Sequence, residues 1–230
     1  MSIVTLNKGA QFEKPSDFFA QSVTGGHGLF ADFFTSSDGG FTLTNAPVVD
    51  GAYGSSLYLD AADELETPAT AAFAPTAGQS FGGAARVKIV HGTPMVTSQN
   101  ILFGTSSVAT PAERIGFSLA TNASSEFVVT CEHDDGTTDS GVALAESELP
   151  GGSDFDYTGW HEYGVLVDVD ANGRCVVKYF IDNVLVKKII TASVSGWAAA
   201  GLAWVQTNLT TSSTVDQAID WISLGSDYRP

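Results

Sequence analysis

The chain has 230 residues, of which 26 are acidic and 10 are basic, so its formal net charge is -16. A surface of this sign repels phosphate backbones and anionic lipids, which excludes nucleic acid and membrane surfaces as expected partners. Only 16% of the residues are charged while 24 are glycine, a composition typical of short strands and tight turns.

The N-terminal sequence MSIVTLNKGAQFEKPSDFF contains no basic segment followed by a long apolar run. We therefore expect neither a signal peptide nor a transmembrane span, and synthesis in a cytoplasm. Residues 1–28 are predicted to form an outer strand or an arm that docks on a neighbouring subunit. Residues 29–230 are predicted to form one β-sandwich domain, since a chain of this length fills a single core.

Apolar and polar residues alternate in short runs along the whole chain, and no segment keeps helical spacing for the length of a globular helix. Strands are predicted at residues 41–45, 56–61, 83–90, 100–105, 114–121, 126–133, 161–169, 174–182, 184–192, 201–208 and 217–225. Only residues 143–149 are expected to contain a helical turn. This many strands in one domain predicts an all-β fold, an antiparallel sandwich of two packed sheets.

The stretch VDVDANGRC matches the opening of an EF-hand loop, which makes Asp168, Asp170 and Asn172 candidate calcium ligands. A complete loop needs a bidentate acid at its twelfth position, and Tyr179 stands there. The flanking residues alternate as strands, so we interpret the stretch as a hairpin whose turn contains Asn172 and the following glycine. Calcium binding remains the alternative, and no other cofactor is indicated.

Three segments in order resemble the concanavalin A-like lectin/glucanase superfamily, including its laminin G-like domains. They are FADFFTSSDGGFTLTNAPVVDGAYGSSLYLDA (30–61), WHEYGVLVDVDANGRCVVKYFIDNVLVKKI (160–189) and AIDWISL (218–224). The resemblance spans roughly residues 28–225 and implies a concanavalin-like jelly roll with one concave and one convex sheet.

Glycosidases of this superfamily carry three acids in an ExDxE or ExDxxE motif, and Glu132 and Asp134 are the nearest match. The third acid is missing, and the pair runs into a turn in which both carboxylates are expected to be solvated. We therefore predict no catalytic residues. GQSFG matches a nucleophile elbow by its letters, but Ser80 precedes a strand where that chemistry needs a helix.

Sugar rings stack on flat aromatic side chains flanked by polar groups, which makes loop aromatics candidate ligand-binding residues. Trp197, Phe155 and Tyr157 lie in predicted loops and are the candidates, with burial beneath a loop as the alternative. Trp160, Trp204 and Trp221 are predicted to be core or sheet-face residues. His161 is expected at the start of a strand with a satisfied hydrogen bond.

The only cysteines, Cys131 and Cys175, lie in separate strand-like runs. This favours buried free thiols, although a single bridge between them is also compatible with the sequence.

These observations favour a non-enzymatic structural or interaction protein, a lectin-like sandwich displayed on a larger assembly. The assembly we expect is a bacteriophage virion, with this chain as a surface decoration, head fibre or tail accessory, in contact with other virion proteins and as a homo-oligomer. One alternative is a soluble glycan-binding module, with or without a calcium requirement, and another is a divergent glycoside hydrolase.

Overall fold

The structure is a computed structural model in which part of the chain is described. The described residues are 27–32, 41–44, 48–50, 56–59, 63–67, 77–91, 99–104, 113–121, 126–135, 141–191, 202–208 and 215–226. They form fifteen strands and two short 3-10 turns. None of them forms a helix that is long and apolar enough to cross a membrane.

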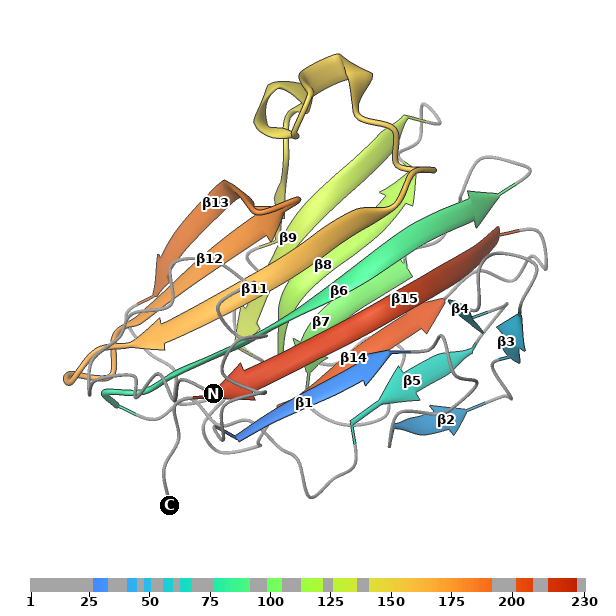
Figure 1. Cartoon of the computed structure of the whole chain (residues 1–230). Helices are drawn as coiled ribbons and strands as arrows, with labels where there is room; N and C mark the ends of the chain where they lie inside the picture. Colours follow the sequence, from blue (N-terminus) through green and yellow to red (C-terminus); the bar gives the residue numbers. More distant parts are fainter. Residues whose placement is uncertain are drawn as a thin grey trace, which may run out of the picture.

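The strands form two antiparallel sheets that pack face to face (Figure 1). Sheet A has the order β13-β12-β11-β6-β15-β4-β3, and β1 also pairs with β15. Its strands are β1 (His27–Asp32), β3 (Val48–Asp50), β4 (Ser56–Leu59), β6 (Ser80–His91), β11 (His161–Val169), β12 (Cys175–Ile181), β13 (Val184–Thr191) and β15 (Val215–Ser226). Sheet A thus contains both the first and the last described strand.

Sheet B has the order β10-β9-β8-β7-β14-β5-β2. Its strands are β2 (Thr42–Thr44), β5 (Glu64–Glu66), β7 (Gln99–Gly104), β8 (Glu113–Thr121), β9 (Phe127–Asp135), β10 (Val142–Ala143) and β14 (Ala203–Asn208). The turns η4 (Glu146–Glu148) and η5 (Gly152–Asp154) lie between β10 and β11. Their segment projects past the strand ends at the top of Figure 1.

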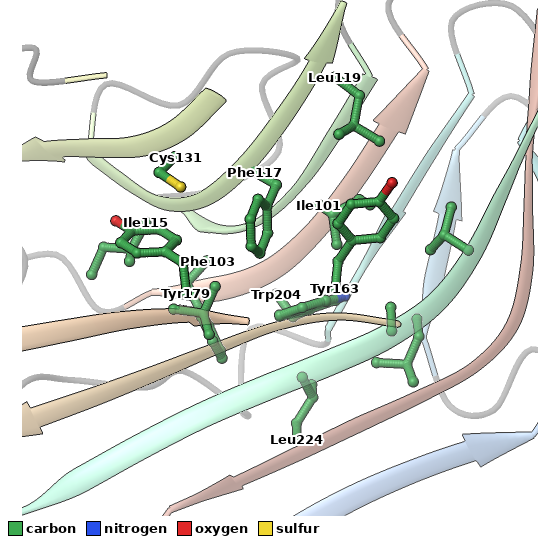
Figure 2. Close-up of a cluster of buried hydrophobic side chains, with 14 of the residues drawn as sticks. Ile101, Phe103, Ile115, Phe117, Leu119, Cys131, Tyr163, Tyr179, Trp204 and Leu224 are labelled. Atoms are coloured by element: carbon green, nitrogen blue, oxygen red, sulfur yellow. The ribbon is translucent and has the colours of Figure 1, made fainter. Parts of the chain in front are cut away.

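The inward-facing side chains of both sheets fill one core (Figure 2). Trp204 is fully buried there, and its ring packs edge to face on Phe103 with 5.0 Å between the ring centroids. Phe117 makes the same kind of contact with Tyr163 and Tyr179, at 5.4 and 5.6 Å. The two Phe117 contacts join sheet B to sheet A, and burial of such large apolar side chains is the main stabilising contribution to a sandwich.

A chain of hydrogen bonds between glutamines runs through this core. Trp204 Nε1 donates to Gln206 Oε1 at 3.1 Å, Gln206 Nε2 to Gln217 at 2.8 Å, and Gln217 Nε2 to Gln99 at 3.3 Å. All four residues are fully buried. Because a buried amide without a partner is costly, this chain fixes β14, β15 and β7 in one relative register.

The predicted all-β sandwich is confirmed, as are the eleven predicted strands in outline. The 3-10 turn η4 falls inside the segment expected to turn, whereas η5 and the strands β1, β3, β5 and β10 were not predicted. Cys131 and Cys175 are buried free thiols, as the sequence favoured. Residues 1–26 lie outside the described part of the chain, so the predicted arm at 1–28 stays a prediction.

The loop between β11 and β12 is one residue longer than a two-residue hairpin turn. Asp170 N donates to Arg174 O at 2.9 Å, Gly173 N donates to Asp170 O at 3.0 Å, and only Gly173 in this loop has a positive φ, +78°. This is a type I turn followed by a left-handed glycine. The tight two-residue turn occurs at the next hairpin, where Asp182 and Asn183 have φ of 51° and 63°.

Candidate functional site

Each sheet also has an outer face, which points away from the core. In sheet B the inward residues of β14 are Leu202, Trp204 and Gln206, so the residues between them point outward. Ala203 and Val205 form a small apolar cluster with Leu102 that is separate from the main core. This cluster marks the middle of the outer face of sheet B.

A row of polar side chains crosses this outer face from strand to strand, and we call it the polar row. Its members are aligned by the registers of six strands, in the order Thr44, Glu64, Thr207, Asn100, Ser118 and Thr130. Asn100 Nδ2 donates to Thr207 Oγ1 at 3.2 Å. These two central members are buried, while those on either side of them are partly or fully exposed. With strands about 4.8 Å apart, the row is about 24 Å long.

Two glutamates stand side by side at one end of this face. Glu64 and Glu66 alternate with the buried Leu65, so both carboxyl groups project from the same side of β5. Burial raises the pKa of both groups, and the neighbouring Glu66 raises the pKa of Glu64 further. Within the described part of the chain, Glu64 Oε1 is buried without a hydrogen-bond partner. Carboxyl groups with perturbed pKa values gather at functional sites more than elsewhere.

The sequence-derived pair Glu132 and Asp134 lies on the same face, on β9. Arg114 Nε donates to Glu132 Oε2 at 3.0 Å, and Arg114 Nη1 lies 3.1 Å from Asp134 Oδ2. The three side chains are only 11–13% exposed. The expectation that both carboxylates are solvated in a turn was therefore wrong. Strand β9 continues to Asp135, and Arg114 on the neighbouring strand β8 covers both carboxylates.

The candidate calcium ligands contact protein groups. Asp168 accepts a hydrogen bond from Ser80 Oγ at 2.8 Å and pairs with Lys178 Nζ at 2.8 Å. Asp170 Oδ1 accepts from the backbone N–H groups of Asn172 and Arg174 at 2.8 and 2.9 Å, which is turn-stabilising geometry. No group of three or more acidic, histidine or cysteine side chains among the described residues could hold a metal ion.

The predicted loop aromatics pack against neighbours. Tyr157 stacks on Phe127 with 4.0 Å between centroids and 11° between planes, and Phe155 lies 4.2 Å from the His161 ring. Both are partly buried against the core. Each of the two rings thus packs on a different neighbouring ring, as expected from the alternative of burial beneath a loop. Trp197 lies outside the described residues.

His161 begins β11 and contacts acceptors at both ring nitrogens. Nδ1 lies 2.7 Å from Asp182 Oδ2, and Nε2 lies 2.6 Å from the carbonyl oxygen of Asp156. Asp182 also accepts a hydrogen bond from the backbone N–H of Glu162 at 2.9 Å. The expectation of a satisfied strand-start histidine is confirmed, and its role is to join the segment after η5 to the β12–β13 hairpin.

Sequence reasoning missed Glu64 and Glu66, although a signal for them exists. In DELET, Asp63, Leu65 and Thr67 are buried and the two glutamates between them are not. An acid at every second position around one leucine is the pattern of a short strand with a carboxylate face.

The order of strands in two packed antiparallel sheets defines this chain as a concanavalin A-like jelly roll. The carbohydrate recognition domain of Emp46p superposes with a TM-score of 0.56 at 12% identity, covering 86% of this chain and 95% of that one. Alginate lyase Aly36B gives 0.57 at 9%, covering 86% and 96%. The carbohydrate esterase of the Shiga toxin-encoding bacteriophage phi24B gives 0.55 at 19%, covering 89% and 100%.

No protein-family model matches the sequence, and no curated protein matches it significantly. At these identities the likeness to solved structures shows the fold alone. It confirms the concanavalin-like fold that the three sequence segments indicated.

Proposed function

We propose that this protein is a non-catalytic carbohydrate-binding sandwich that holds an extended glycan across the outer face of sheet B. The observation that carries the proposal is the polar row, with the partly buried Glu64 and Glu66 at one end. On either side of the buried pair Asn100 and Thr207, the exposed or partly exposed members Thr44, Glu64, Ser118 and Thr130 offer a sugar chain hydroxyl donors and a carboxyl acceptor. The fold is shared with proteins named for carbohydrate recognition or carbohydrate chemistry, which supports the proposal without identifying the sugar.

A glycan array followed by calorimetry on the best ligand tests this function. Glu64→Gln and Glu66→Gln keep the shape of each side chain and remove its charge, so both are expected to weaken binding about tenfold or more, as loss of a charged hydrogen bond does. Glu146→Gln is the matched control, since Glu146 is exposed in η4. Equal affinity for all four proteins would refute the assignment. A second array with EDTA shows whether calcium contributes.

The setting we propose is a larger assembly, with this chain as a surface component of a bacteriophage virion. A phage carbohydrate esterase with the same fold is the observation that favours it. Mass spectrometry of gradient-purified particles from the source lysate is the test. A fixed ratio of this chain to the major shell protein supports the proposal, and absence of the chain from particles refutes it.

The second candidate function is carbohydrate hydrolysis or lysis, and the raised pKa values of Glu64 and Glu66 favour it, because a general acid must hold a proton at working pH. Incubation with glycans that bind on the array should then produce new sugar ends. Production by the wild-type protein and not by Glu64→Gln would establish this function. Glu132→Gln gives the parallel test for the sequence-derived pair. Binding without any product supports the non-catalytic assignment.

A further inference from the structure

The outer face of sheet A, on the opposite side of the sandwich, carries a second group of side chains suited to a ligand. Arg86 lies on β6 between the buried Ala85 and Val87, so it points outward, and its side chain is 45% exposed. Its guanidinium carbon lies 5.4 Å from the ring centroid of Trp160, a cation–π contact. Its Nη1 lies 2.6 Å from Asp220 Oδ2.

A β-bulge brings a second tryptophan to the same arginine. Ile219 pairs with Val87 and Trp221 pairs with Arg86, so Asp220 is an extra residue in β15. Ile219 is buried, and strict alternation from it would turn Trp221 into the core. With the extra residue, Ile222 faces the core instead, and Trp221 stands outward and partly exposed.

The position of this bulge is informative because it falls inside a strand of twelve residues. Bulges recur next to functional sites, where they re-aim side chains. Here one inserted residue places a carboxylate and an indole together beside Arg86. We call Trp160, Arg86, Asp220 and Trp221 the Trp–Arg cluster.

A further acceptor borders the Trp–Arg cluster on its other side. Glu162 on β11 lies opposite Arg86 in the register, and its Oε2 accepts a hydrogen bond from Asn183 Nδ2 at 3.2 Å. The immediate surroundings thus hold two cations, Arg86, which is paired with Asp220, and Lys88, which lies two residues along β6 on the same face, and the three carboxylates of Asp220, Glu162 and Asp182. This balance favours hydroxyl donors over an anionic ligand. Partly exposed indole rings next to carboxylate acceptors are the chemistry that binds a sugar ring, with its C–H face on the aromatic ring and its hydroxyls on the acids.

We propose that the Trp–Arg cluster is a second carbohydrate-binding surface, which takes a neutral sugar ring through stacking on tryptophan and hydrogen bonds to Asp220 and Glu162. This surface lies on the other sheet from the polar row and does not require it. A chain with both sites presents one on each face of the sandwich.

The test is an array of neutral and uronic-acid glycans, followed by titration of the best neutral oligosaccharide with intrinsic tryptophan fluorescence. Trp221→Ala is expected to weaken that binding about tenfold or more, as loss of an aromatic contact with its buried area does. Trp221→Phe keeps a ring and serves where the alanine variant fails to fold, and Arg86→Met keeps the apolar stem. Ile190→Ala is the control, since Ile190 is 54% exposed on β13 of the same sheet.

The outcomes separate this proposal from the polar row. Weaker binding in Trp221→Ala, or in Trp221→Phe where the alanine variant fails to fold, together with weaker binding in Arg86→Met and unchanged binding in Ile190→Ala, supports the Trp–Arg cluster. Loss of binding in Glu64→Gln but not in the cluster variants leaves the polar row standing and overturns the cluster. Binding restricted to uronic-acid glycans, or no neutral glycan bound by the wild-type protein, also overturns it.

Discussion

Gly83 is the position at which one added methyl group should disturb the core most clearly through side chains alone. A Cβ built there would lie 2.5 Å from Leu224 Cδ2 and 2.8 Å from Trp204 Cζ3. Both side chains are fully buried, and the Trp204 ring is also tied through Nε1 to Gln206, so neither can move away freely. Gly83→Ala should therefore lower the free energy of unfolding by about 1–3 kcal/mol, the usual cost of overpacking.

A double-mutant cycle with Leu224→Ala tests the cause of that loss. Leu224→Ala alone should cost about 2–5 kcal/mol through the cavity it leaves. In the double variant the new methyl of residue 83 occupies part of that space, so the combined loss should be about 1–2 kcal/mol smaller than the sum. Urea unfolding followed by tryptophan fluorescence and circular dichroism, with unchanged slopes, measures all four proteins. Additivity within about 0.5 kcal/mol would refute the steric explanation.

Three further predictions concern single side chains. Burial raises the thiol pKa of both Cys131 and Cys175 to about 12, so a thiol reagent at pH 8 should leave both unmodified until urea unfolds the chain, and fast labelling of either in the native protein would contradict their burial. The pKa of Glu64 in the folded protein is raised above its ordinary 4.5. As the pH rises from the unfolded pKa to the folded one, the unfolded chain loses the Glu64 proton before the folded chain does, so native stability falls. Glu64→Gln should therefore raise the urea midpoint at pH 7 and have little effect at pH 4, and an equal shift at both would exclude the ionisation as its cause. Asn183 has φ of 63°, so Asn183→Ala should cost about 1 kcal/mol or more in urea unfolding and Asn183→Gly less. Because both variants lose the hydrogen bond to Glu162, the reverse order would show that the positive φ does not set the difference between them.

The fold followed from the sequence wherever a strand was long enough to show alternation. Strands β8, β11 and β12 each have a buried residue at every second position, and the apolar letters of their sequences carry the same period. Strand β10, with two residues, is too short to show a period, and the three residues of β5 show one only as the two glutamates on either side of Leu65. β10 pairs with the preceding strand β9, whereas β5 pairs with β14, which is distant in sequence, and no local pattern reports that pairing.

The candidate sites were harder to predict from the sequence than the fold, because the register of the strands brings their residues together. Glu66 and Glu132 lie in one line across sheet B through Val205, Leu102 and Gly116. The sequence places them far apart and in unrelated motifs. The motif-like pair Glu132 and Asp134 attracted attention by its spacing, but the residue that defines its chemistry, Arg114, comes from the neighbouring strand.

The bulge in β15 shows what local sequence does and does not reveal. In AIDWISL the buried residues include Ile219, Ile222 and Leu224, so the spacing of the large apolar residues changes from three to two within one strand. The change shows only in the burial of these residues, because in the letters Ile219 and Trp221 are two apart and the two could share the core face. The sequence does not show the surface that receives the ring either. Arg86 and Trp160 come from two other strand regions, and only the register of β6 against β15 and β11 makes a site of them.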